Sequence, residues 1–468
     1  SNSVFFTTGD RRIAPTEDDK YILVPISEKE NVYKSVSELD NGKKPVEVYV
    51  ERISAKVTVT LGKDWATSYK VSTEGEGSST ITIFNSADAT TKTIKVKPVI
   101  LGADLNVLTN KASLIKNITY SPFESGYEYG KAPEGRPSYE KFLWNDPLNM
   151  RSYWAETPVL VGMTYRSFNN VKGKNMEKGE FKPFTAYINP NTQDYTPGNE
   201  DNSLNTKLMV IAQLRGVEVD ANGNEIGTDT ILDLVRFGGE YMLKDQALAH
   251  AANVINVAVR NIDWESKENL SAAEKIILST YVNNSFVPGL SGTLLEIKAN
   301  KKSDYDVYTA VINFKDAENY GYTLQKDTVL NDYEDEAVQA IIKDKNQLDA
   351  TFGKAKSVID EVIKTTLDDL NEKTNIIYWA EGKTYFYTTI KQQGFIGLTG
   401  ADDNYLNGVV RNHIYNITLE SFYGLGTPVI DPGKPIDPER PKEEKPSYIT
   451  AKINILPWRV VTNSATIH

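Results

Sequence analysis

The chain has 468 residues, 63 acidic and 52 basic side chains and a formal net charge of −11, and it contains no cysteine. Its lysines and arginines form no block, which argues against nucleic acid or an anionic membrane as a partner, because both require clustered positive charge. The lack of cysteine excludes disulfides, thiolate metal sites and thiol nucleophiles.

The first 120 residues show the two-residue period of β-strands. Over residues 46–61 apolar and other side chains alternate. The apolar ones occupy even-numbered positions before Glu51-Arg52 and odd-numbered positions after it, which indicates a bulge or a change of partner. These residues are Val46, Val48, Val50, Ile53, Ala55, Val57, Val59 and Leu61. Further strands are predicted at 81–84, 92–101 and 104–120. Residues 1–120 are therefore predicted to form an amino-terminal β-sandwich domain.

Residues 121–158 are rich in Gly, Pro, Tyr and Trp and lack periodicity of either kind. We interpret them as an interdomain passage. The tyrosine-rich part, 120–154, has a second interpretation as an aromatic platform for a ligand, although packing between domains is favoured.

Residues 159–423 are predicted to form a carboxy-terminal β-sandwich domain with helical insertions. A strand over 207–220 leads into a hairpin turn at Asp220-Ala-Asn-Gly-Asn-Glu and a second strand. Helical spacing of apolar residues recurs at 268–282, at 334–344 and most clearly at 355–373. The last helix is amphipathic and is predicted to pack on a sheet, with an exposed partner-binding helix as the alternative.

Residues 424–447 contain six prolines and are predicted to form a stiff spacer. At about 3.1 Å per residue its reach is on the order of 50–70 Å.

Residues 448–468 contain an apolar strand beyond this spacer, because Ile449, Ala451, Ile453 and Ile455 alternate with polar residues. Burial of three isoleucines and one alanine is worth roughly 5–9 kcal/mol at about 1.5–3 kcal/mol per large side chain. Pro457 has no N–H and is predicted to mark a break or turn after this strand. The tail either folds back onto its own domain or completes the sheet of another molecule.

Motifs for catalysis, cofactors and metals are absent from the sequence. There is no phosphate-binding loop, hydrolase nucleophile elbow or His-Glu-x-x-His motif. The histidines, His250, His413 and His468, are scattered and do not indicate a triad or a metal site. Asp220-x-Asn222-x-Asn224 begins like a calcium loop, but Glu225 and Ile231 occupy the positions of the required glycine and bidentate acid. The sequence therefore predicts no enzyme, no cofactor and no metal.

Two threonines are candidate O-glycosylation sites. Asp229-Thr-Ile and Asp327-Thr-Val resemble short Asp-Thr-apolar acceptor motifs, which gives Thr230 and Thr328.

The carboxy-terminal region contains a recognisable set of motifs: Leu406-Asn-Gly-Val-Val-Arg-Asn-His-Ile-Tyr-Asn-Ile-Thr-Leu, Gly424-Leu-Gly-Thr-Pro-Val, the proline spacer and Ile453-Asn-Ile-Leu-Pro-Trp-Arg-Val-Val. Together these motifs resemble the major fimbrillins of the Bacteroidetes, the FimA/Mfa-type or type V pilins, and the resemblance is strongest after residue 375. Weaker matches are Val50-Glu-Arg-Ile-Ser-Ala-Lys-Val and Arg151-Ser-Tyr-Trp-Ala-Glu.

The resemblance implies two transthyretin-like β-sandwich domains, export as a lipoprotein and trimming by an arginine-specific protease at the cell surface. Removal of the first strand would open a groove that a neighbouring subunit's carboxy-terminal strand fills. Subunits would thus form a homopolymer by donor-strand exchange, with accessory and anchor subunits, in a fimbrium at the outer membrane that supports adhesion, colonisation and virulence. The donor-strand residues would be Ile449, Ala451, Ile453, Ile455, Trp458 and Val460.

The amino terminus departs from the family pattern. About 50 residues precede the Val-Glu-Arg segment, fewer than the family normally has, so we expect the chain to start inside the first domain. Arg11 and Arg12 are the candidate processing site, with two exposed loop arginines as the simpler interpretation. No secretory signal stands at the start, which fits a cytoplasmic protein or a trimmed exported form.

Two other functions compete with that of a polymerising subunit. One is an accessory or tip adhesin that binds host glycan or protein, and the other is a carbohydrate-binding surface lipoprotein that does not polymerise. A polymerising subunit needs a detachable strand, whereas an adhesin needs an exposed binding surface.

Overall fold

The computed structural model describes residues 5–7, 50–63, 65, 69–71, 79–85, 87–112, 162–192, 204–287, 290–300, 309–316, 320, 323–324, 334–390, 408–409, 411, 413–437, 448–457 and 464–466. For 5–7, 50–52, 192, 281–287, 323–324, 408, 448–457 and 464–466 it describes the backbone alone.

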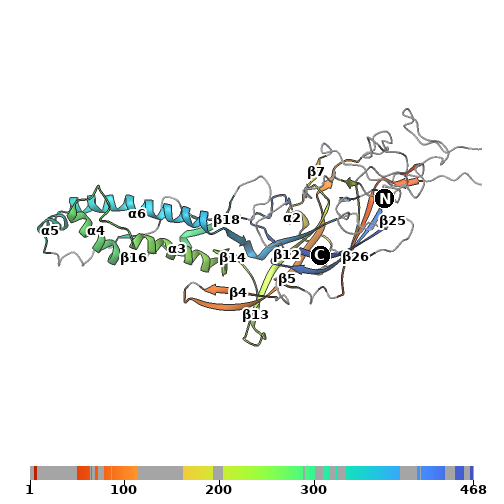
Figure 1. Ribbon diagram of the computed structural model, residues 1–468, viewed down its shortest axis with the longest axis horizontal. Helices are drawn as coiled ribbons and strands as arrows, with labels where there is room; N and C mark the ends of the chain where they lie inside the picture. Colours follow the sequence, from red (N-terminus) through yellow and green to blue (C-terminus); the bar gives the residue numbers. More distant parts are fainter. Residues whose placement is uncertain are drawn as a thin grey trace, which may run out of the picture.

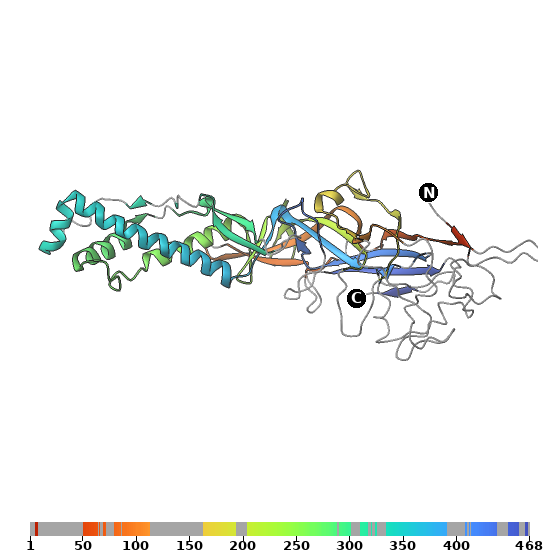
Figure 2. The ribbon, with the colours of Figure 1, turned by 90° about the horizontal axis from the view of Figure 1, so that it is seen from above.

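The protein is mainly β, as predicted, and is elongated, with packed sheets at one end and a helical arm at the other (Figures 1 and 2). One sheet has five strands in the order β10 (Phe184–Ile188), β3 (Ala55–Leu61), β23 (His413–Tyr423), β25 (Tyr448–Pro457) and β26 (Ser464–Thr466). The eleven-stranded sheet has the order β17 (Leu295–Ala299), β18 (Thr309–Phe314), β20 (Ile376–Trp379), β14 (Leu234–Phe237), β15 (Glu240–Leu243), β4 (Thr80–Asn85), β5 (Thr90–Asn106), β12 (Lys207–Val219), β21 (Lys383–Thr389) and β24 (Thr427–Pro428), with β13 (Glu225–Ile231) also paired to β12.

The remaining described strands form two-stranded ladders. These are β1 (Phe5–Thr7) with β2 (Val50–Arg52), β6 (Leu108–Thr109) with β7 (Met163–Thr164), β8 (Met176–Glu177) with β9 (Glu180–Phe181), β11 (Asn191–Thr192) with β22 (Gly408–Val409), and β16 (Phe286–Val287) with β19 (Thr323–Leu324). The helices are α2 (Phe168–Val171), α3 (Lys244–Arg260), α4 (Ala272–Ser285), α5 (Glu336–Lys343) and α6 (Lys345–Lys373), with 3₁₀ turns η3 (Gly292–Leu294) and η5 (Ala380–Gly382).

The two large sheets pack face to face as a β-sandwich. Alternate residues of β3 and β23 are buried, and they meet alternate residues of β5, β12 and β21 from the opposite sheet. This core includes Ala55, Val57, Val59, Leu105, Leu208, Val210, Phe386, Tyr415, Ile417 and Leu419. The two-residue period seen in the sequence therefore gives each strand one face in the core.

The strands on either side of the predicted passage at 121–158 share their sheets. β3 lies between β10 and β23, and β5 pairs with β12 along most of its length. The described strands of the predicted domains 1–120 and 159–423 are thus interleaved in one sandwich and do not form two separate ones. Alternation fixes which face of a strand is buried, but partners distant in sequence are decided by register and tertiary packing.

The helical arm contains the three helices predicted from sequence spacing and also α3, which the spacing did not predict. α4 and α5 lie within a few residues of the predicted bounds, whereas α6 begins at Lys345 instead of residue 355. α4, α5 and α6 correspond to the predicted helices at 268–282, 334–344 and 355–373, and His250 lies in α3. Ile359, Ile363 and Leu367 of α6 are buried against α3 and the sheet strand β18, as expected of an amphipathic helix. The alternative of an exposed partner-binding helix does not hold for this face.

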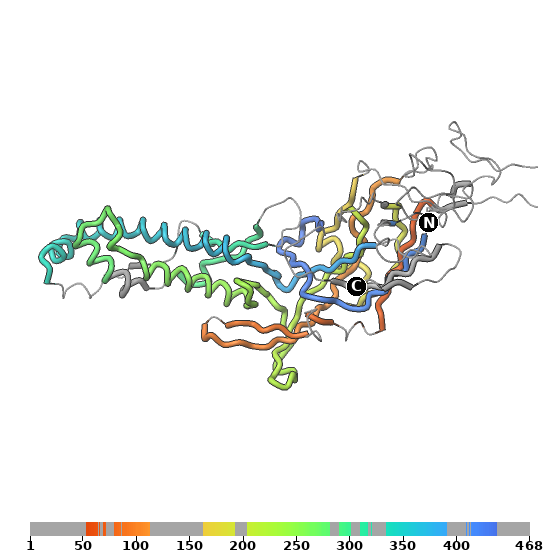
Figure 3. The backbone as a smooth tube through the Cα atoms, in the orientation of Figure 1, coloured from red at the N-terminus to blue at the C-terminus, as the bar shows by residue number. Residues whose placement is uncertain are grey.

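Two hairpins project sideways where the sandwich meets the arm, β4–β5 and β12–β13 (Figure 3). The second is the hairpin predicted after 207–220. Asp220 accepts hydrogen bonds from the backbone N–H groups of Asn222 and Asn224, both at 2.9 Å, and from the Asn224 side chain at 3.0 Å. These bonds hold the pKa of Asp220 below its usual value and define a turn that closes on itself.

We predict that Gly102→Ala lowers the free energy of unfolding by about 1–3 kcal/mol, because a Cβ at this position of β5 would lie 2.2 Å from the Val171 carbonyl oxygen of α2. The matched control is Gly353→Ala in α6, where a Cβ has nothing within 4 Å; it should stabilise by roughly 0.5–1 kcal/mol. Urea denaturation measures both. A Gly102→Ala midpoint equal to that of the wild type would contradict the close approach of α2 to β5.

Candidate functional site

The candidate site is the edge of the five-stranded sheet that β25 occupies. β25 runs antiparallel to β23, from the pair His413 and Pro457 to the pair Tyr423 and Tyr448, with a register shift between Leu419 and Ser421. On its other side β23 runs parallel to β3. The tail strand therefore satisfies one complete backbone edge of β23, while the body of the protein satisfies the other.

The register places the predicted apolar residues of the tail in phase with the core. Ile455 lies opposite Tyr415, and Ile453 lies opposite Ile417. Both β23 residues are fully buried. Because directly opposite residues of an antiparallel pair project from the same face, the register assigns Ile453, Ile455 and Ala451 to the core face.

The floor of this edge is aromatic. Phe422 of β23 stacks against Phe386 of β21, with ring centroids 4.2 Å apart, and meets the Trp65 ring edge to face at 4.4 Å. The backbone of β25 also comes close to that of β21 in the opposite sheet. A long apolar strand is the element that such an edge can accept.

His413 lies at the far end of the β23–β25 ladder. It is buried, its Nδ1 lies 2.8 Å from the Arg411 carbonyl oxygen, and its ring is near that of Tyr415. Burial lowers the pKa of His413 below its ordinary value because the interior disfavours the imidazolium. The histidine therefore occupies a buried position in β23.

The predicted spacer 424–447 differs from expectation in its first part. Instead of standing free, residues up to Asp437 pack on the eleven-stranded sheet: β24 pairs with β21, and Val429 and Ile436 are fully buried. Prolines remove backbone donors but also suit a chain that crosses a sheet surface without joining its ladder. Residues 438–447 lie outside the described part of the chain.

The structure describes only some of the other predicted site residues. The strand predicted to end at Pro457 is β25, while Trp458 and Val460 lie outside the described residues, as do Arg11, Arg12 and Thr328. Thr230 is exposed on β13, with its hydroxyl 3.5 Å from the Gly216 carbonyl oxygen. An acceptor site there would be accessible.

The described residues hold no group of three or more His, Asp or Glu side chains able to bind a metal ion. Among the helices that the structure describes, none is long and apolar enough to cross a membrane.

Residues 377–464 match the family model of the C-terminal region of the major fimbrial subunit protein type IV, fimbrillin. The chain carries a fimbrillin C-terminal region. The matched segment contains β23, the packed residues that follow it and β25, so the acceptor edge and the strand on it belong to one family feature. This match supports a fimbrillin-type subunit at the cell surface, a class of structural rather than catalytic proteins. No curated protein matches the chain significantly.

Sequence analysis of the fimbrillin region found the tail but missed its neighbours. The buried path of 425–436 was hidden by its prolines, although Val429 and Ile436 are the apolar residues that could have indicated it. The parallel pairing of β3 with β23 left no signal in the sequence, because the two strands are more than 350 residues apart.

We predict that His413 makes the protein less stable as the pH falls from about 6.5 to 5. The unfolded chain takes up the proton near pH 6.5 while the buried histidine does not, so stability is complete above that pH and decreases below it, by at most about 1.4 kcal/mol per pH unit. His413→Gln should flatten this dependence in urea denaturation.

The effect of His413 on stability occurs in a different pH range from that of the carboxylates. Hydrogen bonds from Lys97 and Lys95 hold the pKa of Glu225 below its ordinary value, so its contribution is lost only in more acidic solution, below about pH 4.5. If the free energy of unfolding of the wild type and of His413→Gln depended equally on pH between pH 6.5 and 5, the assignment of this effect to His413 would be contradicted.

Proposed function

We propose that the protein is a structural subunit of a cell-surface fimbria and that it polymerises by placing β25 on the β23 edge of a neighbouring copy. The observation that carries the proposal is the β23–β25 register, which pairs a chain-terminal apolar strand with a strand of the body. The fimbrillin match over 377–464 supports the same function. No metal, cofactor or catalytic group takes part, because the chemistry is backbone hydrogen bonding and apolar burial.

β25 is the strand of the five-stranded sheet that can be exchanged between copies. The strands on the other side of it, β23, β3 and β10, pair with one another and bury their side chains in the sandwich core. β25 and its outer partner β26 both follow Asp437 in the sequence, and Ile436 beside it is buried against the body. The same ladder can therefore form within one chain or between two, which is the condition for strand exchange.

The balance between the two arrangements depends on competition for the edge. Contacts along β23 are equal in both cases, so occupation by a chain's own tail competes with occupation by a neighbour's tail. A filament forms when each tail occupies the next subunit, because this head-to-tail contact does not close on itself.

The proposed maturation step is proteolysis at Arg11 or Arg12. β1 pairs with β2 through Phe5, Phe6 and Thr7, and both arginines follow β1 in the sequence. Cleavage there would separate β1 from the remainder of the chain.

We predict that a disulfide forms between copies at the β23–β25 ladder. Thr418 of β23 lies directly opposite Lys452 of β25, and the chain has no native cysteine. Filaments assembled from a mixture of Thr418→Cys and Lys452→Cys chains should give cross-linked dimers on oxidation, read on a non-reducing gel. Opposite residues of a strand pair are close enough for a disulfide.

The register control is Asn454→Cys mixed with Thr418→Cys. Asn454 pairs with Asn416, two residues away, and should cross-link poorly. The double variant Thr418→Cys/Lys452→Cys reports pairing within one chain. An intramolecular disulfide in the double variant, together with no dimer from the mixed single variants, would show that the tail only folds back, which leaves an adhesin or a non-polymerising surface protein as the function.

We predict that Ile453→Asp prevents filament formation, while Lys452→Asp permits it. Ile453 is paired with the fully buried Ile417, so a carboxylate at this register position loses its hydration at a cost of several kcal/mol. Lys452 has the opposite phase and pairs with Thr418, which is half-buried. Negative-stain electron microscopy compares the two variants. Normal filaments from Ile453→Asp would contradict the proposed donor strand.

A further inference from the structure

Residues 425–436, here called the strap, join the acceptor strand to the tail and are attached to the body throughout. The first half follows β21: Pro428 pairs with Thr384, and the Thr384 hydroxyl lies 2.7 Å from the Leu425 carbonyl oxygen and 3.0 Å from that of Thr427. The Trp379 indole N–H donates to the Gly426 carbonyl at 3.1 Å. These bonds hold the strap before it reaches the far side of the sheet.

The second half of the strap is held by the segment that contains α2. Ser167 forms a bridge with Pro435, the Ile436 N–H donates to the Arg166 carbonyl at 2.8 Å, and the Asn169 N–H donates to the Pro432 carbonyl at 2.9 Å. The apolar side chains of the strap pack in the same place, with Val429 and Ile436 in one buried cluster with Phe168, Val171, Met209, Ile211 and Tyr385.

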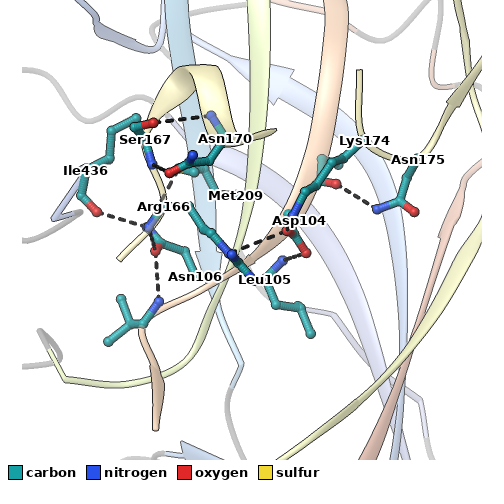
Figure 4. A network of polar contacts seen from close by, with 12 residues as sticks. Asp104, Leu105, Asn106, Arg166, Ser167, Asn170, Lys174, Asn175, Met209 and Ile436 are labelled. Atoms are coloured by element: carbon teal, nitrogen blue, oxygen red, sulfur yellow. Dashed lines mark hydrogen bonds and ion pairs between the residues drawn. The ribbon is translucent and has the colours of Figure 1, made fainter. Parts of the chain in front are cut away.

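Asn106, at the end of β5, connects all of these parts (Figure 4). Its side chain is fully buried; Nδ2 donates to the Ile436 carbonyl at 2.9 Å, while Oδ1 accepts from the N–H groups of Arg166 at 2.8 Å and Val107 at 2.9 Å. One amide therefore joins the strap, the α2 segment and the sheet. A buried amide with this many partners is fixed in position, since each lost bond would leave a polar group unsatisfied.

Asp104 supports the same segment from the surface side. Its Oδ2 lies 2.7 Å from Lys174 Nζ and 3.5 Å from Arg166 Nε (Figure 4). The backbone around Arg166 is thus restrained on both sides of the contact with Ile436.

We propose that the strap is a fixed anchor, which stays docked while the tail is exchanged, and that Asn106 is the positioning residue that holds its end. This inference rests on the proposed function. Exchange then involves only the residues after Asp437, and each tail leaves its subunit at one defined point. Tension along a filament passes from the tail to the sheet through the hydrogen bonds of Ile436 rather than by peeling of β23.

The first test locks the strap with a disulfide. The variant Ser167→Cys/Pro435→Cys replaces the two bridged residues, whose backbones are at the spacing of a strand pair, in a chain without native cysteine. We expect the disulfide to form in the full-length monomer, and the oxidised protein to assemble to within twofold of the reduced protein by light scattering and electron microscopy.

Assembly of the reduced protein together with failure of the oxidised protein would overturn the proposal, because the strap would then have to detach. Failure of the disulfide to form in the monomer would overturn it as well. Ser167→Cys alone controls for loss of the Ser167 hydroxyl, which accepts a hydrogen bond from the Asn170 N–H. A second control is Thr58→Cys/Thr185→Cys, which places a disulfide between opposite residues of β3 and β10. It shows whether oxidation by itself affects assembly.

The second test measures hydrogen exchange in Asn106→Ala. Exchange of the Val429 and Ile436 amides should become at least tenfold faster than in the wild type, with the β3–β23 amides unchanged. Adding the Ser167→Cys/Pro435→Cys disulfide should restore protection. The matched control is Asn371→Ala, because the Asn371 side chain of α6 also bonds to backbone groups, the N–H and the carbonyl of Ile312, but lies in the helical arm.

This measurement needs no filament. A failure of the anchor proposal can therefore be told apart from a failure of the proposed function. A wild-type chain that never assembles contradicts the proposed function, and the anchor is then judged in the monomer. Unchanged exchange at Val429 and Ile436 in Asn106→Ala overturns the role of Asn106 in either case.

Discussion

The edge of β23 that faces β25 is the constraint on which this protein depends. The side chains of β23 are part of the sandwich core, so its backbone cannot move out into water to satisfy its polar groups. β3 pairs with one edge and leaves the other for β25. Because an unpaired edge with an apolar floor is costly and prone to pairing, some strand has to occupy it. In this structure β25 of the same chain occupies it, and under the proposed function β25 of a neighbouring copy takes its place.

The strap ends beside Asp437, the last residue that the structure describes before β25. The strap before it has contacts with three separate parts of the body, through β21, the α2 segment and Asn106, and these contacts depend on side chains as well as backbone. β25 is paired with β23 in an antiparallel ladder. Under the proposed function β25 is exchanged between copies, while the strap keeps its contacts with several elements of its own subunit.

The eleven-stranded sheet joins the sandwich to the helical arm. β14 and β20 are buried on both faces, with Val235, Ile376 and Tyr378 in the core of the arm and Leu234, Ile377 and Trp379 in a neighbouring core. Their short, continuously apolar sequences reflect this double burial. The arm is thus an extension of the same sheet that anchors the strap.

The sequence by itself determined the mainly β composition, the alternation of the core strands, three helices of the arm and the apolar tail, because alternation and helical spacing are local properties. Ile453 and Ile455 were identified as core residues of a strand before any partner was known, and the register agrees with that phase. The tertiary structure alone decided that β3 lies beside β23, that the predicted domains interleave, and that half of the proline-rich segment is docked. Those outcomes depend on pairing between residues hundreds of positions apart and on buried polar contacts such as that of Asn106 with Ile436, for which a single sequence has no periodic signal.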